Sequence, residues 1–326
     1  MRVMKQLNVP YEDIVSVENL LAAWEEFVEG KRGKRDVQEF QLRLMDNILS
    51  LHRDCSTLTY RHGLYRAFNI SDPKPRNIHK ATVRDRLLHH AISRKLYLYF
   101  DKRFIHDSYS CRLNKGTHKA TERFKYFARK ISANNTKTCW VLKCDVRKFF
   151  ASVDHEILLR ILARHNLDAD LLRLLRCVIE SFETAPGKGL PLGNLTSQLL
   201  VNIYMNEFDQ WVKHMLKAKH YIRYADDFVL LFSDKTRPAA IFRYIETFLW
   251  KQLRLSLHPD KVSVQTLASG VDFLGWVHFP DHRVLRTTTK RRMENRLSEN
   301  TSPETRQSYL GLLSHGNAWK LRQKIG

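Results

Sequence analysis

The sequence predicts an α+β protein built on an antiparallel sheet, and three stretches of the chain support this prediction. Residues 220–232 contain two apolar, β-prone runs around an Ala-Asp step, which is the pattern of a tight β-hairpin. Residues 139–145 form another apolar run, typical of a buried strand, that ends in an aspartate. Residues 200–215 instead repeat apolar side chains at helical spacing, so helices are expected to pack on the sheet.

Periodicity and the positions of glycine and proline predict the remaining elements. Before the first predicted strand, helices are expected over 17–29, over 36–53, beyond the extended segment at 72–86, and in the second half of 109–130. After it, helices are expected over about 154–163 and 169–183, from about 194 and from Pro238. Short strands are expected at 254–257, at 262–266 and, interrupted by Gly275, over 271–279. A small basic helical module, with helix signals from Ser302-Pro303, ends the chain.

The composition points to a polyanionic partner. The 326 residues contain 55 Lys and Arg against 34 Asp and Glu, which gives a net charge of +21. Such a surplus indicates nucleic acid most simply. A basic protein at a membrane surface is the alternative, but no run of 18 apolar residues, signal peptide or lipidation signal supports it. The five cysteines form no Cys-x-x-Cys pair, which argues against zinc and for a reducing compartment, so a cytoplasmic location is expected.

Three aspartates are candidate metal ligands. Asp226 and Asp227 are adjacent in the predicted hairpin turn, and Asp145 ends the buried strand. Carboxylates on neighbouring strand ends can hold a pair of Mg²⁺ ions, which prefer hard oxygen ligands. Two such ions clamp the attacking and leaving oxygens of a phosphoryl transfer. Taken alone, an Asp-Asp pair is more often a solvated turn and a strand-terminal aspartate is often a helix cap, so the prediction depends on their combination.

Two further segments carry candidate phosphate contacts. A proline-restricted segment over 72–86 leads basic side chains, including Arg76 and Arg84, into a helix. Guanidinium groups there could grip a triphosphate bidentately, whereas structural ion pairing is the alternative for any one of them. A Gly/Pro loop over 186–198 leads into the next helix, whose free N–H groups suit a phosphate or a base edge.

In their order along the chain, these segments resemble reverse transcriptases over roughly residues 60–325. The Tyr224-Ala-Asp-Asp227 box is similar to the catalytic turn of that family, and residues 144–150 resemble its first catalytic strand. Lys261 matches a lysine of the motif after the palm helix, and residues 273–276 resemble the primer-grip hairpin. The resemblance implies a right-hand polymerase fold. The N-terminal extension and fingers would cover 1–137, the palm 138–280 with a fingers return at about 160–190, and a small helical thumb 281–326.

The resemblance also implies a role for each matching residue. Asp145 and Asp226 would bind both Mg²⁺ ions with the backbone carbonyl of Val146, and Asp227 would be a supporting carboxylate. Lys261 would neutralise phosphate charge and protonate the leaving pyrophosphate. Phe150 would place a ring beneath the sugar and clash with a 2′-hydroxyl. Arg76 and Arg84 would hold the incoming deoxynucleotide.

One departure from the family pattern narrows the resemblance. Most reverse transcriptases read Gln-Gly-x-x-x-Ser-Pro in the Gly/Pro loop, whereas this chain has Leu192, Gly193, Ser197 and Gln198 at those positions. That version resembles the reverse transcriptases of diversity-generating retroelements, as do residues 110–118 and 308–317. It implies a bacterial or phage-encoded enzyme that copies a template-repeat RNA into cDNA with errors at adenines, for mutagenic retrohoming. It also implies a primer, deoxynucleotide substrates and a small basic accessory protein.

Other functions stay open from the sequence. A group II intron or retron-type reverse transcriptase is the nearest alternative, although it predicts Gln at 192 and Pro at 198. A defence-associated enzyme with untemplated synthesis and a cyclic-dinucleotide synthase use related palms. A palm-fold RNA-binding protein without catalysis is a different class, and the three aspartates weigh against it.

Overall fold

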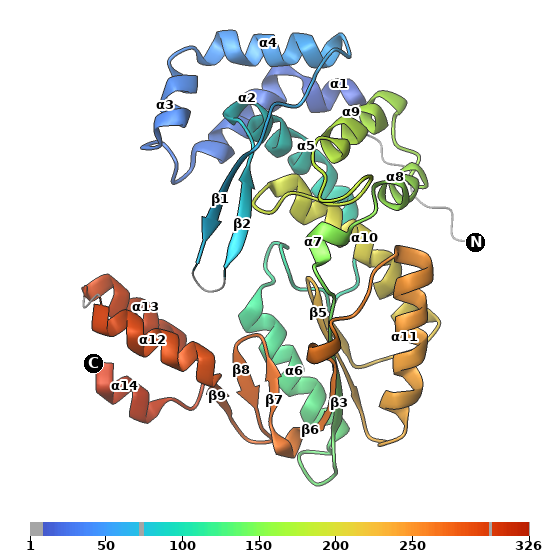
Figure 1. Ribbon diagram of the computed structural model, residues 1–326, viewed down its shortest axis with the longest axis vertical. Helices are drawn as coiled ribbons and strands as arrows, with labels where there is room; N and C mark the ends of the chain where they lie inside the picture. Colours follow the sequence, from blue (N-terminus) through green and yellow to red (C-terminus); the bar gives the residue numbers. More distant parts are fainter. Residues whose placement is uncertain (1–8, 72–74, 300–301, 326) are drawn as a thin grey trace. The chain divides into compact units, whose positions relative to one another are not determined.

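The computed structural model describes residues 9–71, 75–299 and 302–325, and the chain forms two compact units. Unit 1 is drawn from Met1–Ile105, Arg147–Gln210 and Phe248–Ser256. Unit 2 is drawn from His106–Val146, Trp211–Thr247 and Leu257–Gly326. Each unit therefore combines segments that are far apart in sequence (Figure 1).

Unit 1 is mostly helical. Its N-terminal helices are α1 (Tyr11–Val15), α2 (Val17–Val28), α3 (Arg35–Gln41), α4 (Leu44–Ser56) and α5 (Val83–Asp101). The apolar face of α2 packs along α5, and α1 and α4 cover the same core. Its later helices are α7 (Phe149–Ser152), α8 (His155–Ala163), α9 (Ala169–Glu180) and the first part of α10 (Leu195–His214).

An antiparallel hairpin of unit 1 joins α4 to α5. Its strands are β1 (Arg66–Ile70) and β2 (Arg76–Lys80), and Arg66 pairs with Lys80 at its base. The base is anchored by Asp85, a buried carboxylate near the start of α5. Asp85 accepts hydrogen bonds from Tyr60 Oη at 2.7 Å and from the backbone N–H of Gly63 at 3.2 Å. A buried carboxylate satisfied in this way fixes the chain where it enters the hairpin.

The centre of unit 2 is a four-stranded antiparallel sheet of order β4-β5-β3-β6. Its strands are β3 (Trp140–Asp145), β4 (Tyr221–Tyr224), β5 (Asp227–Phe232) and β6 (Ser263–Thr266). Helix α6 (Thr117–Ile131) packs on β4 and β5 through Phe124 and Phe127, which join one apolar core with Val141, Ile222 and Val229. Helix α11 (Arg237–Leu253) follows β5.

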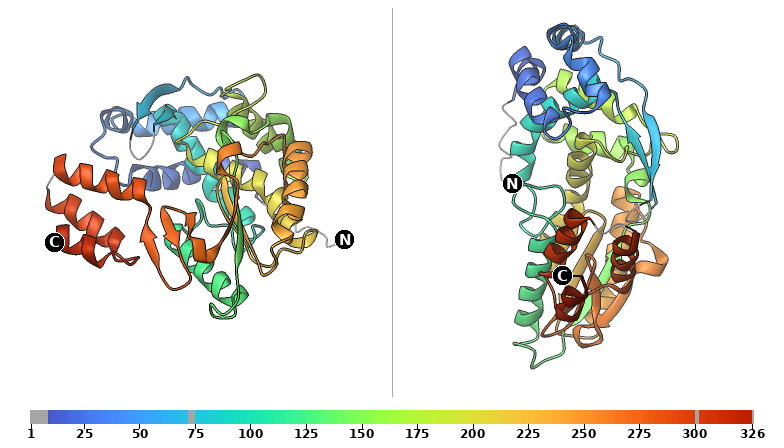
Figure 2. Two further views of the ribbon diagram at one scale, coloured as in Figure 1. Left: turned by 60° about the horizontal axis from the view of Figure 1, so that its bottom comes forward. Right: turned by 90° about the vertical axis from the view of Figure 1, so that its left-hand side faces the viewer.

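A second sheet and three short helices complete unit 2. The sheet has the order β7-β8-β9, with β7 (Val271–Phe273), β8 (Trp276–His278) and β9 (Arg283–Leu285). Helices α12 (Thr287–Glu299), α13 (Pro303–Leu313) and α14 (Trp319–Ile325) form a cluster that both views of Figure 2 show. Trp276, Leu285, Met293 and Leu313 bury the apolar face shared by this sheet and these helices.

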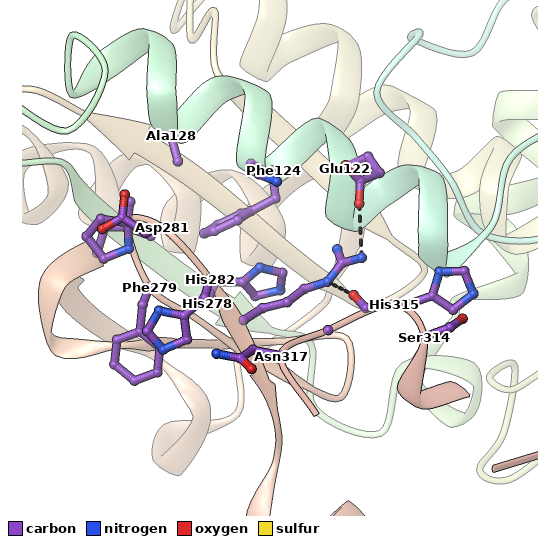
Figure 3. Close-up of a pocket in the computed structure, with 15 residues that line it drawn as sticks. Glu122, Phe124, Ala128, His278, Phe279, Asp281, His282, Ser314, His315 and Asn317 are labelled. Atoms are coloured by element: carbon purple, nitrogen blue, oxygen red, sulfur yellow. Dashed lines mark hydrogen bonds and ion pairs between the residues drawn. The ribbon is translucent and has the colours of Figure 1, made fainter. Parts of the chain in front are cut away.

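Arg283 links three of these elements around a cavity of about 420 Å³ (Figure 3). Its Nη2 pairs with Glu122 on α6 at 2.9 Å, and its Nε donates to the carbonyl of His315 after α13. The guanidinium also lies over the ring of Trp276. Gly316 fits against the same ring so closely that a Cβ atom would clash with it.

The structure confirms the predicted fold class and corrects two predicted elements. The helix expected over 36–53 is divided into α3 and α4, because Arg43 leaves helical backbone geometry at φ −126° and ψ 43°. Residues 254–257 form no strand but only an isolated bridge between Leu257 and Val146. The interruption expected at Gly275 within 271–279 is confirmed, because β7 and β8 pair as a hairpin whose turn has Leu274 and Gly275 at positive φ. The predicted domain boundaries at 137 and 280 remain a prediction, since the compact units divide the chain differently.

Candidate active site

Three aspartates gather at one end of the four-stranded sheet in unit 2. Strands β3 and β5 are paired so that Asp145 lies directly opposite Asp227. The backbone N–H of Val146 donates to the carbonyl of Asp226 at 3.0 Å, which ties the end of β3 to the hairpin turn. Because directly opposed residues of an antiparallel pair have Cα atoms only about 4.5–5.5 Å apart, the two strand ends form one carboxylate cluster.

A buried arginine holds the turn that carries Asp226. Ala225 has a φ of +54°, a conformation that costs energy for a residue with a side chain. The fully buried Arg223 compensates, since its Nη1 donates to the Ala225 carbonyl at 3.1 Å and its Nη2 to Ser108 Oγ at 3.0 Å. Arg223 was not among the residues predicted to act in the site. The available signal was a charged residue inside an otherwise apolar strand pattern.

Two lysines balance the negative charge of the cluster. Lys261 Nζ lies 2.9 Å from Asp145 Oδ1, so the lysine predicted from the family pattern does reach a predicted catalytic carboxylate. Lys143 Nζ lies 3.9 Å from Asp227 Oδ2 and donates to the Asp272 carbonyl at 2.6 Å. Lys143 was not predicted. It could have been found from strand periodicity, because it lies two residues before Asp145 and therefore on the same face of β3.

The environment of Asp227 opposes the ionisation of its carboxyl group. Burial, first, and the negative charges of Asp145, Asp226 and Asp272 raise its pKa to about 7, although Lys143 acts in the opposite direction. Its Oδ1 is buried and has no hydrogen-bond partner. A buried oxygen without a partner is costly, so this atom is suited to a cationic ligand.

The donor set fits a divalent cation. Aspartate oxygens are hard ligands of the kind that Mg²⁺ prefers, and Asp227 offers an oxygen without a partner. Within 9–71, 75–299 and 302–325, no three His, Cys, Asp or Glu side chains are already arranged to ligate a metal. Lys261 pairs with Asp145 Oδ1 at 2.9 Å, so its ammonium group occupies an oxygen that an ion would otherwise use.

Replacing Asp227 with asparagine tests the raised pKa of this carboxyl. The ordinary pKa of an aspartate side chain is 3.8, whereas the pKa of Asp227 in the folded protein is about 7. Between these two pH values the folded state therefore binds one proton more than the unfolded state. Metal-free protein should therefore lose stability as the pH rises from about 4 to 7. Asp227→Asn cannot ionise and is expected to be more stable than wild type at pH 8, by as much as ~4 kcal/mol, with little difference at pH 4.

Thermal unfolding in chelator at both pH values measures this effect. Glu246→Gln, at an exposed carboxylate of the same unit, is the matched control and should not alter the pH dependence. Parallel pH profiles for wild type and Asp227→Asn would contradict the assignment.

The predicted nucleotide-contact loop lies in unit 1, where it is bound to the β1–β2 hairpin. The backbone N–H of His79 donates to the Leu192 carbonyl at 3.2 Å, and Asn194 Nδ2 donates to the His79 carbonyl at 3.1 Å. Gly193 has a φ of +102°, and a Cβ atom there would lie 2.9 Å from Ile78 Cγ2. The glycine is therefore required for close packing, and the loop is positioned by the strand that also carries Arg76.

The other predicted contacts of unit 1 have different environments. Arg76 is exposed on β2. Arg84 instead pairs with Asp54 at 2.6 Å, so for this residue the structure has the ion pair that was the alternative to a triphosphate contact. Phe150 is partly buried in α7, and its carbonyl accepts from the Leu190 N–H at 2.8 Å. The first turn of α10 contains Ser197, which is buried, and Gln198, which is half-buried. The predicted site residues thus divide between the units, with the three aspartates, Val146 and Lys261 in unit 2.

The chain is similar to known proteins in sequence. A family model described as "Reverse transcriptase (RNA-dependent DNA polymerase)" matches residues 71–278. Protein YkfC of Escherichia coli strain K12 is 27% identical over 290 residues, which cover 77% of this chain and 74% of that protein. The Putative COX1/OXI3 intron 1 protein of Saccharomyces cerevisiae is 26% identical over 172 residues, or 50% of this chain and 20% of that protein.

The fold is similar to that of solved telomerases. The match to telomerase from Candida albicans, solved with a fragment of telomeric RNA, has a TM-score of 0.50 at 13% identity. The match to apo telomerase from Candida tropicalis has a TM-score of 0.52 at 10% identity. These matches cover 70% and 69% of this chain but only 46% and 55% of the telomerase chains, so this chain spans about half of their length. The likeness supports a right-hand polymerase fold.

Proposed function

Because the chain belongs to the reverse transcriptase (RNA-dependent DNA polymerase) family, we propose that Asp145, Asp226 and Asp227 form its polymerisation centre. The observation that carries the proposal is the strand register that sets Asp145 opposite Asp227 beside the turn with Asp226. Template RNA, a primer and deoxynucleotides are the substrates. The primer 3′-hydroxyl attacks the α-phosphorus of the nucleotide, and pyrophosphate leaves.

The residues of unit 2 have distinct tasks in this reaction. Asp145, Asp226 and the Val146 carbonyl would hold two Mg²⁺ ions, supported by Asp227. When bound, such ions neutralise the charge that develops on the attacking and leaving oxygens. Lys261, 2.9 Å from Asp145, is placed to neutralise phosphate charge and to give a proton to the leaving pyrophosphate.

The residues of unit 1 select and hold the nucleotide. Arg76 is exposed and available for a triphosphate, whereas Arg84 would have to exchange Asp54 for it. Phe150 excludes the 2′-hydroxyl by its bulk. Gly193, Ser197 and Gln198 shape the loop and helix start behind the nascent base pair.

Leu192 supports the finer assignment to a diversity-generating retroelement. A leucine has no donor or acceptor with which to hold the nascent pair in register, so the contacts there are apolar and discriminate by only about 1–3 kcal/mol. In this proposal the enzyme copies a template-repeat RNA into adenine-mutagenised cDNA for mutagenic retrohoming. It works in the cytoplasm of a bacterium, encoded by the host or a phage, with a small basic accessory protein. No helix in the described parts of the chain is both long and apolar enough to span a bilayer.

A group II intron or retron-type enzyme is the second candidate. The similarity to the Putative COX1/OXI3 intron 1 protein favours it. Such an enzyme is expected to carry Gln and Pro at the positions of Leu192 and Gln198, and this chain does not. Accurate copying of adenines by the wild-type enzyme would favour this second candidate.

Replacing Leu192 with glutamine tests the finer proposal. The amide restores hydrogen bonding around the nascent pair, so misincorporation opposite template adenine should fall several-fold, and more than opposite other bases. Base-resolved sequencing of cDNA copied from one defined RNA, with any accessory protein that the enzyme needs, measures the error at each base.

Leu192→Met keeps an apolar side chain and is the matched control, with errors expected near those of wild type. The competing interpretation is that Leu192 merely packs the loop. An unchanged adenine error fraction in a Leu192→Gln enzyme that still polymerises would support that interpretation and remove Leu192 as a fidelity determinant.

A further inference from the structure

Unit 2 contains a cavity of about 490 Å³ at the end of its four-stranded sheet opposite the aspartates. The cavity is lined by the end of β5, the loop after α10, the start of α11 and the end of α6. Phe232, which lines it, pairs with Trp140, whereas Asp227 pairs with Asp145 at the other end of the same two strands. Five residue steps along β5 place the cavity about 17 Å from the aspartates, at a rise of roughly 3.4 Å per residue. It is therefore distinct from the proposed polymerisation centre.

The rim of this cavity is uniformly basic. Lys130, Lys217, Lys219 and Arg237 line it, all four are exposed, and no Asp or Glu is among the lining residues. None of the four forms an ion pair with a residue that the structure describes, although Asp234 lies close enough to Arg237 to interact electrostatically. Some basic groups elsewhere are neutralised instead, as Arg84 and Arg86 are by carboxylates. Four converging cations repel one another, so an anionic ligand would relieve this repulsion.

A histidine that lines the cavity is affected by the same positive charges. His220 is half-buried and contacts the ring of Phe127 edge-on at 5.0 Å. Burial, first, and then the positive charges of Lys130, Lys213 and Lys219 lower the pKa of His220. The imidazole is therefore neutral at pH 7 and retains an N–H that can donate to an anion.

The floor of the cavity is apolar. Leu231 and Phe232 are buried, and Ile131, Leu216 and Ile241 are half-buried around them. A cationic rim above an apolar floor suits a nucleotide, whose phosphate is anionic and whose base and sugar present flat or apolar faces. The volume falls within the range of about 300–1,000 Å³ typical of ligand sites.

We propose that this cavity binds the phosphate backbone of a single-stranded segment of RNA, away from the site of synthesis. An RNA strand is favoured over an acidic protein segment because the family copies RNA, and because the apolar floor would accept a base. The identity of the polyanion thus rests on the proposed function, whereas the site itself rests on the cavity and its charges. A strand held here would be retained by contacts that do not depend on the aspartates.

Neutralising three of the four cations tests the proposal. The pocket variant carries Lys130→Gln, Lys219→Gln and Arg237→Gln, and it leaves Lys217 unchanged because its positive φ makes substitution less neutral. Binding of a fluorescent 40-nucleotide RNA is measured by anisotropy over a series of salt concentrations. Loss of three phosphate contacts should reduce the slope of log K against log salt by about 2, and should weaken binding about tenfold or more near physiological salt.

A control variant removes the same charge elsewhere. Lys102, Arg243 and Lys251 are exposed and do not line the cavity, so their replacement with glutamine should alter the salt slope much less. Equal losses in both variants, or no loss in the pocket variant, would overturn the proposal. Weaker binding of polyglutamate with unchanged binding of RNA would also overturn it, and would assign the cavity to an acidic protein segment.

A second readout separates this proposal from the proposed function. The pocket variant should extend a primer on a short RNA–DNA duplex at the wild-type rate, because that duplex offers no long single strand. Asp226→Ala should bind the 40-nucleotide RNA as wild type does. The binding measurement needs no synthesis, so an inactive wild-type enzyme would refute the proposed function and leave the test of the cavity intact.

Discussion

Alanine at Asp226 or at Asp145 is expected to abolish Mg²⁺-dependent incorporation of deoxynucleotides while RNA binding persists. These carboxylates lie at two neighbouring strand ends, and removal of either leaves too few oxygen ligands for a pair of ions. The loss of rate should be roughly 10³-fold or more. RNA affinity depends instead on the net positive charge, which comes from 55 basic and 34 acidic residues distributed along the chain. The affinity for RNA should therefore fall steeply with salt in both variants and in wild type.

Primer extension on a defined RNA, with Mg²⁺ titrated from zero, measures the effect. Asp234→Ala removes an exposed aspartate beyond the far end of β5 and should extend the primer as wild type does. Near-wild-type polymerisation by Asp226→Ala or Asp145→Ala would end the metal assignment.

Alanine at Phe150 is expected to admit ribonucleotides. The ring is partly buried in α7, where the hydrogen bond from Leu190 to the Phe150 carbonyl fixes the backbone. Removing the ring opens space for a 2′-hydroxyl without changing the groups that hold the triphosphate. Rejection by a pocket wall is worth a few kcal/mol, so the preference for deoxynucleotides should fall about tenfold or more.

Competition between dATP and ATP in primer extension measures this preference. Phe150→Tyr keeps an aromatic ring of similar width and should continue to exclude ATP, which separates ring bulk from a general effect of substitution. A ratio of dATP to ATP incorporation that does not change in Phe150→Ala would remove Phe150 from this role.

Local sequence patterns predict much of the proposed polymerisation centre. The apolar runs around Ala225 predict β4, β5 and the turn between them, and the run that ends at Asp145 predicts β3. These are short-range signals, since alternation and turn residues act within a few positions of the chain. The fold class was predictable for the same reason, and so was membership of the reverse transcriptase family, whose motifs are contiguous in sequence.

Residues that act at a distance were not predictable in this way. Arg223 reads as one charged residue in a strand, and only folding brings its guanidinium to Ser108. Lys143 acquires its role because β5 and β7 bring Asp227 and Asp272 to it. Likewise, no glycine or proline marks the break between α3 and α4 at Arg43, so local sequence signals do not predict it.

The sequence by itself determined the type of most main elements, the three aspartates as candidate ligands and the basic composition that indicates nucleic acid. Only the tertiary structure decided that Asp145 faces Asp227, that Leu192 is hydrogen-bonded to the strand carrying Arg76, and that Lys130 meets Arg237 at one cavity. The physical reason is that propensity and periodicity depend on neighbours in the chain. Pairing register, burial and the raised pKa of Asp227 depend instead on which distant segments pack together.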